Sequence, residues 1–164
     1  MRKGLLAILA LALPVAAGAQ PAHPDRARPG AAARRGVSAV RAEAEAFMAG
    51  YARDLRAGDR AAIAARYDRR GSWRVGGGTK RFEPWALTRD HYAGPWTPPA
   101  SFAWSDLSYE VLGPDAVLVT GLFRWGLAGR DPLIFSYTGL LVRQGRELRI
   151  RLEDESGPAP GTGG

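Results

Sequence analysis

The spacing of apolar residues divides the chain into a helical first part and a strand-rich second part. Apolar side chains over residues 40–55 recur at intervals of three and four, which predicts one buried stripe on a helix. Gly58 is placed to end this helix, and Asp59 to cap a second helix that stops near Gly71. A third, short helix is predicted over residues 84–92, because it opens with a proline.

After the third helix the apolar pattern changes to the two-residue alternation of strands. Short links rich in glycine separate the alternating runs, so neighbouring strands are expected to be antiparallel and to form a meander. A further short strand is predicted over residues 72–75, and the "GGGTKRFE" that follows it is interpreted as a flexible loop. The four long strands are predicted over residues 101–112, 116–125, 133–143 and 147–155.

The first long strand contains a break in its alternation. Phe102 and Trp104 fall on one face, whereas the next apolar residues fall on the other unless one residue near Ser105 or Asp106 is bulged out. A bulge bends and twists a strand. The fold class predicted is therefore α+β, with three N-terminal helices packed in the concave face of a curved antiparallel sheet, a cystatin-like cone.

The two ends of the chain differ in composition from this central unit. A short basic start, an apolar run and Ala17-Gly18-Ala19 are typical of a cleavable signal peptide over residues 1–19. Residues 20–36 and 157–164 are expected to be a disordered linker and tail around a domain at 37–156. The apolar run is too short to span a membrane comfortably, so a periplasmic or secreted protein without membrane insertion is predicted.

Charge and residue counts exclude several classes of function. The net charge of +7 lies mostly outside the domain, since residues 37–156 hold 17 basic and 15 acidic side chains. That balance gives no electrostatic basis for binding nucleic acid. The chain has no cysteine, and His91 is the only histidine of the domain, so neither a zinc site nor a disulfide is expected. No cofactor is predicted.

The order of elements is similar to that of a known superfamily. With "YARDLRAGDRAAIAARY" at the front and "SYTGLLVRQGRELRIRLEDES" at the back, residues 37–156 resemble the nuclear transport factor 2-like superfamily. The SnoaL-like polyketide cyclases and the ketosteroid isomerase relatives are the most similar groups, and the leader would make this an exported, bacterial-type member. The resemblance implies a conical pocket between the helices and the sheet.

The resemblance also implies roles for particular residues. Ketosteroid isomerases use a tyrosine of helix one, which corresponds to Tyr51, and an acid on the third meander strand, which corresponds to Tyr137. Their aspartate base corresponds to a position near Val75, which cannot accept a proton. The isomerase mechanism is thus not expected, although Tyr51 and Tyr137 could still stabilise an oxyanion.

The last strand, "LRIRLEDES", supplies the candidate carboxylate. Strict alternation places Ile150, Leu152 and Asp154 on one face, and the resemblance places that face on the cavity wall. An aspartate in an apolar cone would have a raised pKa suited to proton abstraction. The alternative is that Asp154 only hydrogen-bonds a nearby tyrosine or amide. His91 is a further candidate for proton transfer, or else a surface or capping residue.

The domain is rich in aromatic residues, which indicates a pocket for a flat or lipophilic guest. Core packing and a dimer face are the alternative explanation. Apolar residues on both faces of residues 117–119 favour a covered outer surface and hence a homodimer. The residues predicted to bind the ligand are Tyr51, Tyr67, Trp73, Trp85, Trp104, Trp125, Tyr137, Ile150 and Leu152.

Two functions follow from these observations. The first is non-covalent binding of a small apolar or aromatic molecule by an exported domain. The second is a cofactor-independent cyclase, isomerase or dehydratase that uses Asp154 as base, together with His91, Tyr51 and Tyr137.

Overall fold

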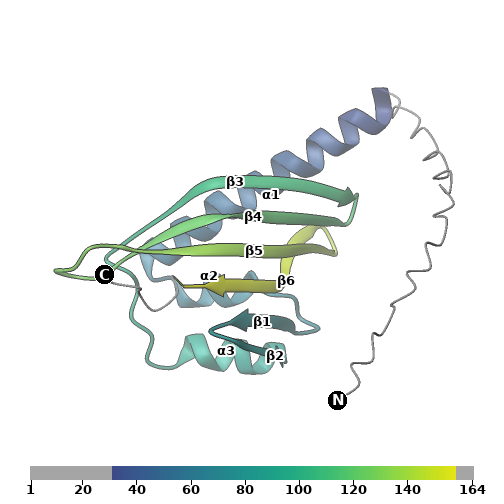
Figure 1. Ribbon diagram of the computed structural model, residues 1–164. Coiled ribbons are helices and arrows are strands. Elements are labelled where there is room, and N and C mark those ends of the chain that lie inside the picture. The colour runs from purple at the N-terminus through teal and green to yellow at the C-terminus, as the bar shows by residue number, and fades with distance from the viewer. Residues whose placement is uncertain (1–30, 158–164) are drawn as a thin grey trace, which may run out of the picture.

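The structure, a computed structural model, describes residues 31–157, with side chains from Gly36 onward (Figure 1). The predicted leader and the outer parts of the predicted linker and tail lie outside the described residues. The first helix begins at Ala31, inside the segment expected to be linker. The elements are α1 (Ala31–Ala57), α2 (Arg60–Ala65), β1 (Ser72–Gly76), β2 (Thr79–Glu83), α3 (Trp85–Ala93), β3 (Ser101–Gly113), β4 (Ala116–Gly126), β5 (Leu133–Gln144) and β6 (Glu147–Ser156).

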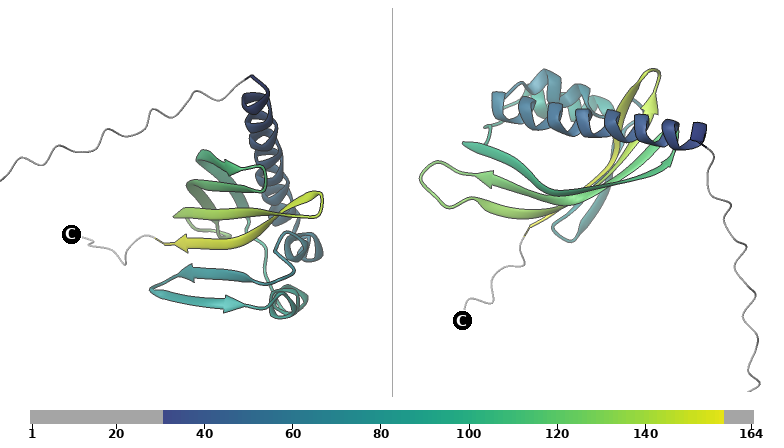
Figure 2. Two further views of the ribbon diagram at one scale, coloured as in Figure 1. Left: turned by 90° about the vertical axis from the view of Figure 1, so that its right-hand side faces the viewer. Right: turned by 90° about the horizontal axis from the view of Figure 1, so that it is seen from above.

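The strands form one curved sheet in the order β2-β1-β6-β5-β4-β3. All three helices lie on its concave side, and the sheet bends around them (Figure 2). The predicted α+β class is therefore confirmed. The sheet is mixed rather than purely antiparallel, because β1 pairs in parallel with β6 while every other pair is antiparallel.

The hydrophobic core lies between α1 and the concave face of the sheet. The predicted stripe of α1 is buried through Met48, Tyr51 and Leu55, and it packs on inward-facing residues such as Val119 and Leu141 of the meander. Apolar residues three and four apart share one side of a helix, which is why this stripe meets the sheet. No helix among residues 31–157 is long and apolar enough to cross a membrane.

The predicted bulge in β3 is present. Ser105 pairs with Leu122 and Ser108 pairs with Thr120, so β3 holds one more residue than β4 over this stretch. Asp106 has a φ of 53°, in the left-handed region that few residues other than glycine adopt. The bulge returns the apolar residues of both halves of β3 to the concave face.

A second bulge, which the sequence pattern did not indicate, lies in β6. Leu141 pairs with Ile150 but Leu140 pairs with Leu152, so Arg151 is an extra residue in the ladder. Before the bulge β6 bonds to residues 66–68, where Asp68 N–H donates to the carbonyl of Ile150 at 3.0 Å. After the bulge β6 pairs with β1. The extra residue shifts the side-chain alternation by one, which decides which carboxylates face inward.

The segment predicted as a flexible loop is instead a β-hairpin. Gly77 and Gly78 form its two-residue turn, and both have the positive φ, 55° and 75°, that a type I′ turn requires. The correction has a clear cause: four of the five residues of β2 are exposed, so the strand shows no apolar alternation. Its one buried residue is Glu83, which is part of the site described next.

Candidate functional site

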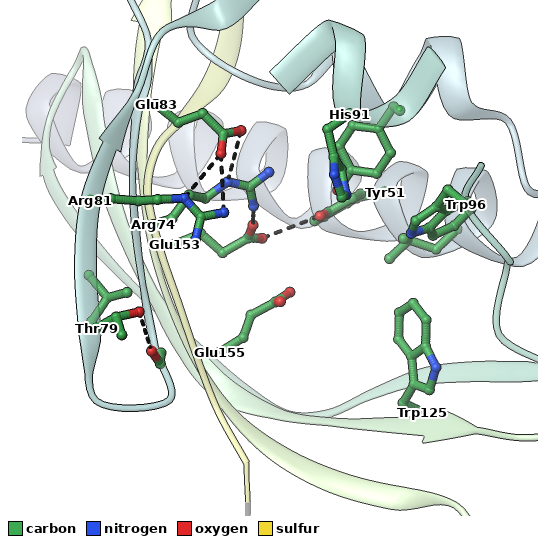
Figure 3. Close-up of a pocket in the computed structure, with 14 residues that line it drawn as sticks. Tyr51, Arg74, Thr79, Arg81, Glu83, His91, Trp96, Trp125, Glu153 and Glu155 are labelled. Atoms are coloured by element: carbon green, nitrogen blue, oxygen red, sulfur yellow. Dashed lines mark hydrogen bonds and ion pairs between the residues drawn. The ribbon is translucent and has the colours of Figure 1, made fainter. Parts of the chain in front are cut away.

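A cavity of about 330 Å³ lies at the end of the cone where α3 and the β1–β2 hairpin approach the sheet (Figure 3). Charged side chains occupy one wall and aromatic side chains the opposite wall, with Glu155 between them. The sequence predicted an apolar, aromatic pocket. The cavity is instead amphipathic. Its lining residues are Tyr51, Leu55, Arg74, Val75, Gly76, Thr79, Arg81, Glu83, His91, Tyr92, Trp96, Trp125, Glu153 and Glu155.

Glu153 is the centre of a buried hydrogen-bond network behind the charged wall. Its side chain is 1% exposed and forms an ion pair with Arg74 of β1, its lateral neighbour in the sheet. The Tyr67 hydroxyl donates to Glu153 Oε2 at 2.7 Å, and Arg74 Nη1 donates to the Tyr67 oxygen at 2.8 Å. The Tyr51 and Tyr67 hydroxyl oxygens are 2.8 Å apart. A buried carboxylate is tolerated here because a cation and hydroxyl donors surround it.

This network determines whether the Tyr51 hydroxyl acts as a hydrogen-bond donor or acceptor toward the cavity. The Tyr67 proton is used on Glu153, so the Tyr51 hydroxyl donates to the Tyr67 oxygen or to Glu153 Oε1, which lies 3.3 Å away. Burial first, and then the negative charge of Glu153, raise the pKa of Tyr51 well above its ordinary value. Tyr51 therefore presents lone pairs to the cavity, as an acceptor, instead of the donor that an oxyanion would need.

Glu83 and Arg81 of β2 complete the charged wall. The Thr88 hydroxyl donates to Glu83 Oε1 at 2.7 Å, and Arg81 Nη2 donates to Glu83 Oε2 at 3.2 Å. Burial favours a higher pKa for Glu83, but the Thr88 hydrogen bond and the Arg74 and Arg81 guanidinium groups outweigh it and lower the pKa. Glu83 is thus ionised at neutral pH, and the carboxylates and guanidinium groups of this wall balance one another.

Glu155 differs from the other carboxylates of the cavity. Its side chain points into the space between the two walls and makes no hydrogen bond or ion pair with residues 36–157 (Figure 3). It is exposed to solvent in the open cavity, although protein surrounds it on its other sides. Loss of hydration, reinforced by the charge of Glu153 and opposed by Arg74, raises its pKa from 4.5 to about 8. At neutral pH Glu155 is thus largely a neutral acid that can donate a hydrogen bond.

The opposite wall is a row of edge-to-face aromatic rings. Tyr92 and Trp96 lie 5.7 Å apart, centroid to centroid, and Trp96 and Trp125 lie 6.3 Å apart at an interplanar angle of 78°. His91 packs edge-on against Tyr92 at 5.0 Å and reaches the cavity from α3. Such rings offer flat apolar surface to a guest.

The sequence placed the candidate catalytic carboxylate, Asp154, on the cavity wall, and this prediction is wrong. Because of the bulge at Arg151, Asp154 and Leu152 lie on the outer face of the sheet, and Glu153 and Glu155 face inward. The Ser156 hydroxyl donates to Asp154 Oδ1 at 2.7 Å, which gives Asp154 a local structural partner. Ile150 does face inward, but it is fully buried in the core and does not line the cavity.

Four of the other predicted residues lie at or next to the cavity. Tyr51, His91 and Trp125 line it, and Tyr67 lies directly behind it in the network of Glu153. Tyr137 is only 1% exposed, and its hydroxyl finds no hydrogen-bond partner within the described part of the chain. Burial raises its pKa well above the ordinary value.

The three remaining tryptophans that were predicted to bind ligand lie elsewhere. Trp104 packs in the core, and its indole N–H donates to the Met48 carbonyl at 3.1 Å. Trp73 lies on the outer face of β1, with its ring 5.3 Å from that of Phe82. Trp85 packs on the far side of α3, where the guanidinium groups of Arg69 and Arg89 lie over its ring. These tryptophans fill or cover the structure without reaching the cavity.

The sequence interpretation missed the charged wall. Three glycines separate "SWRV" from "TKRFE", and such a glycine-rich turn is a hairpin signal that would have brought Arg74, Arg81 and Glu83 together. No comparable signal marked Glu153 and Glu155, because the bulge at Arg151 leaves the apparent alternation intact. Among residues 36–157 no cluster of three or more histidine, cysteine or acidic side chains is arranged to hold a metal ion.

Comparison with known proteins supports the fold rather than a particular activity. The sequence matches no family model and no curated protein. The structure is similar to a nuclear transport factor 2-like protein of unknown function from Pseudomonas putida KT2440, with a TM-score of 0.64 and 18% identity, covering 76% of this chain and 91% of that one. It is also similar to a cystatin-like fold protein from Burkholderia xenovorans LB400, with a TM-score of 0.62 and 18% identity, covering 75% and 95%.

A third similar structure carries the name of an enzyme. It is a candidate scytalone dehydratase from Novosphingobium aromaticivorans DSM 12444, with a TM-score of 0.62 and 12% identity, covering 77% of this chain and 89% of that one. At these identities the likeness concerns the arrangement of the backbone and leaves the chemistry of the cavity to be argued from its residues. The chain has the nuclear transport factor 2-like fold, in which a curved sheet wraps around its helices to form a cone.

Proposed function

We propose that the cavity binds a small amphipathic organic molecule without covalent chemistry. A flat apolar part of the guest packs on Trp96 and Trp125, and a polar group meets Glu155 and the charged wall. The observation that carries this proposal is the Glu155 carboxyl, which points into the cavity without a partner among residues 36–157. A polar group left without a protein partner at the centre of a pocket is available to fix the orientation of a ligand.

The protonation state of Glu155 defines the chemistry of the preferred guest. With a pKa of about 8, Glu155 donates a hydrogen bond at neutral pH, so the complementary group is an acceptor such as a carbonyl oxygen. The Tyr51 hydroxyl oxygen faces the same cavity as an acceptor, so it can bind a hydroxyl group of the guest. The charged wall is internally neutralised, so a guest with a net charge gains little there and loses its hydration.

Acetophenone, a ring with one carbonyl, is a suitable probe. Titration should change the tryptophan fluorescence, because Trp96 and Trp125 line the cavity. The affinity should decrease as the pH rises through about 8, where Glu155 loses its proton. In Glu155→Gln, which keeps a donor, the affinity should no longer depend on pH in this range. Asp154→Asn, a change to the neighbouring residue on the outer face, is the matched control. The charge of Asp154 is the smallest of the contributions to the pKa of Glu155, so this variant should keep most of the wild-type pH dependence.

A second candidate function is proton transfer by Glu155. A carboxyl with a pKa near the working pH is suited to act as a general acid or base, and it replaces Asp154 in the enzyme hypothesis. Among the similar structures are one named as a candidate scytalone dehydratase and one named as a candidate ketosteroid isomerase, which supports this alternative. Isomerases and dehydratases both move protons next to a carbonyl or hydroxyl carbon.

The same probe separates binding from catalysis. If Glu155 removes protons next to a carbonyl, the protein should accelerate exchange of the acetophenone methyl hydrogens in heavy water, as followed by proton NMR. This acceleration should disappear in Glu155→Gln and persist in Asp154→Asn. Binding without accelerated exchange would leave the cavity as a binding site alone.

We also propose that the protein is exported. The basic start, the apolar run and the small residues at 17–19 support this proposal, and the first 30 residues lie outside those that the structure describes. Mass spectrometry of the protein recovered from the periplasm or medium of a bacterial host should give a mature chain that begins at Gln20. A full-length chain confined to the cytoplasm would contradict the proposal.

A homodimer is proposed on the basis of an apolar row that crosses the outer face of the sheet. Laterally paired residues extend this row from β4 through β5, β6 and β1 to β2, and they are in order Leu118, Leu140, Leu152, Trp73 and Phe82. Phe82 is 41% exposed, and the other four are half-buried. A continuous apolar row on an outer sheet face supports association with a second copy.

A further inference from the structure

A second hollow adjoins the cavity on the concave surface of β4 and β5. It has a volume of about 320 Å³ and is lined by Phe123, Trp125, Leu127, Leu133, Phe135 and Glu155. Two of these residues, Trp125 and Glu155, also line the first cavity. The Glu155 carboxyl therefore stands where the two spaces meet, with the polar cavity on one side and this second hollow on the other.

The second hollow is apolar apart from Glu155. The rings of Phe123 and Phe135 stack 4.8 Å apart at an angle of 8° and form its floor. Leu133 and Leu127, at its edge, are 43% and 39% exposed. Phe123 and Trp125 pair across the strands with Phe135 and Leu133, so the apolar surface is built on rigid paired backbone rather than on a loop. Water in contact with this surface would be displaced favourably by an apolar chain.

Resting on the proposed function, we propose that the guest is an elongated molecule with a ring, a hydrogen-bond acceptor and an apolar tail, in that order. The ring occupies the first cavity against Trp96 and Trp125, the acceptor meets the Glu155 carboxyl, and the tail lies on Phe123 and Phe135. Aryl ketones and aryl esters with a chain of several carbons have this order of groups. The second hollow then determines the preference for chain length.

The alternatives fit the lining residues less well. A charged tail would lose its hydration against Phe123, Phe135 and Leu133 without gaining a partner, because Glu155 is the only titratable residue among the described residues that line the second hollow. A short guest confined to the first cavity would leave Leu127, Leu133 and the half-buried Phe135 in contact with water. Only a guest that extends from the first cavity beyond Glu155 into the second hollow covers this apolar surface.

A homologous series of alkyl phenyl ketones tests the proposal. Acetophenone, butyrophenone and hexanophenone share the ring and the carbonyl and differ only in tail length. Each added methylene that is buried should tighten binding by up to about fourfold, which corresponds to ~0.8 kcal/mol. Affinities measured by tryptophan fluorescence and by calorimetry should therefore rise steeply from acetophenone to hexanophenone.

Substitution of the exposed leucines locates the tail. Leu133→Ser and Leu127→Ser should each lower the ratio of hexanophenone affinity to acetophenone affinity by severalfold, because a hydroxymethyl group replaces apolar surface. Leu112→Ser is the matched control, since Leu112 is an exposed leucine of β3 outside both spaces and is 55% exposed. Its affinity ratio should equal that of the wild type.

The possible results separate this inference from the proposed function. If acetophenone binds but longer tails bring no gain, the extended site is overturned while the binding function stands. If tails bring a gain that Leu133→Ser and Leu127→Ser leave unchanged, the tail lies elsewhere and the second hollow has no such role. If no ketone of the series binds, the proposed function fails and the extended site fails with it.

Discussion

At the residue scale, the ion pair between Arg74 and Glu153 is the most demanding feature of the site. Glu153 is almost fully buried, and Arg74 is the cation that balances it. Burial by itself would favour the neutral form of the Arg74 guanidinium, but the surrounding tyrosines and Glu153 raise its pKa well above the ordinary value. Arg74 is thus held charged by its surroundings, and either partner of the ion pair would be an uncompensated buried charge without the other.

Removal of the cation should therefore destabilise the protein strongly. Arg74→Met is expected to lower the free energy of unfolding by about 3–5 kcal/mol, as measured by urea denaturation. Arg74→Met/Glu153→Gln should recover much of this loss, because no charge is then left buried. Arg89→Met is the control: the Arg89–Asp90 pair is more than half exposed on both sides and should contribute no more than about 1 kcal/mol. Equal losses for Arg74→Met and Arg89→Met would contradict this account.

The raised pKa of Glu155 also predicts how stability depends on pH. In the unfolded chain Glu155 titrates near 4.5, and in the folded protein near 8, so the folded state holds the extra proton between these values. The free energy of unfolding should therefore decrease as the pH rises from about 5 to about 8. Glu155→Gln should remove this part of the pH dependence and be the more stable protein above pH 8. Urea denaturation of the wild type and of Glu155→Gln across this pH range measures the effect. The same pH dependence of the free energy of unfolding in both proteins would contradict the raised pKa of Glu155.

At the element scale, two bulges show what a sequence pattern can and cannot reveal. The bulge in β3 was predicted because Phe102 and Trp104 stand out of phase with the apolar residues after it. The bulge in β6 occurs after Ile150, where leucine and aspartate continue the alternation without any visible fault. Its cause is tertiary, since β6 changes its neighbour from residues 66–68 to β1 at this point. A sequence pattern alone could therefore not distinguish Asp154 from Glu155 as the inward carboxylate.

The close approach of the β1–β2 hairpin to the backbone of β6 can be tested by substitution. At Gly76, which has a φ of 151°, an added Cβ would lie 2.8 Å from the backbone oxygen of Glu155. Gly76→Ala should lower the free energy of unfolding by about 1–3 kcal/mol and displace Glu155. Gly77→Asn is the control, because Gly77 faces open space and asparagine tolerates its left-handed backbone. Chemical denaturation measures the loss, and a loss for Gly77→Asn as large as that for Gly76→Ala would contradict the close approach.

At the scale of the whole molecule, the cone follows from features that the sequence does display. The helix stripe, the Gly58-Asp59 corner and the glycine turns are local, and they were sufficient to predict three helices and a curved sheet. The parallel pairing of β1 with β6 joins residues about eighty positions apart, and it has no local signal. That same pairing brings Arg74 to Glu153. The charged wall therefore depends on the least predictable contact of the fold. Of the aromatic wall, Trp125 was predicted, whereas Tyr92 and Trp96 were not.

The apolar row on the outer face of the sheet leads to a prediction about assembly. Leu140 lies at its centre, with Leu118 and Leu152 as its lateral neighbours. Sedimentation equilibrium at micromolar concentration should give the mass of a dimer. Leu140→Lys should give a monomer, because a lysine charge at the centre of an apolar interface cannot be hydrated or paired.

The site provides the control for this dimer prediction. Leu140 points away from the cavity, so the fluorescence response of Leu140→Lys to acetophenone should match that of the wild type. Glu110→Lys changes the charge of the residue that pairs with Leu118 at the end of the row, and it should leave the dimer largely intact. A wild-type monomer, or a Leu140→Lys protein that sediments as a dimer, would show that this face does not hold two copies together.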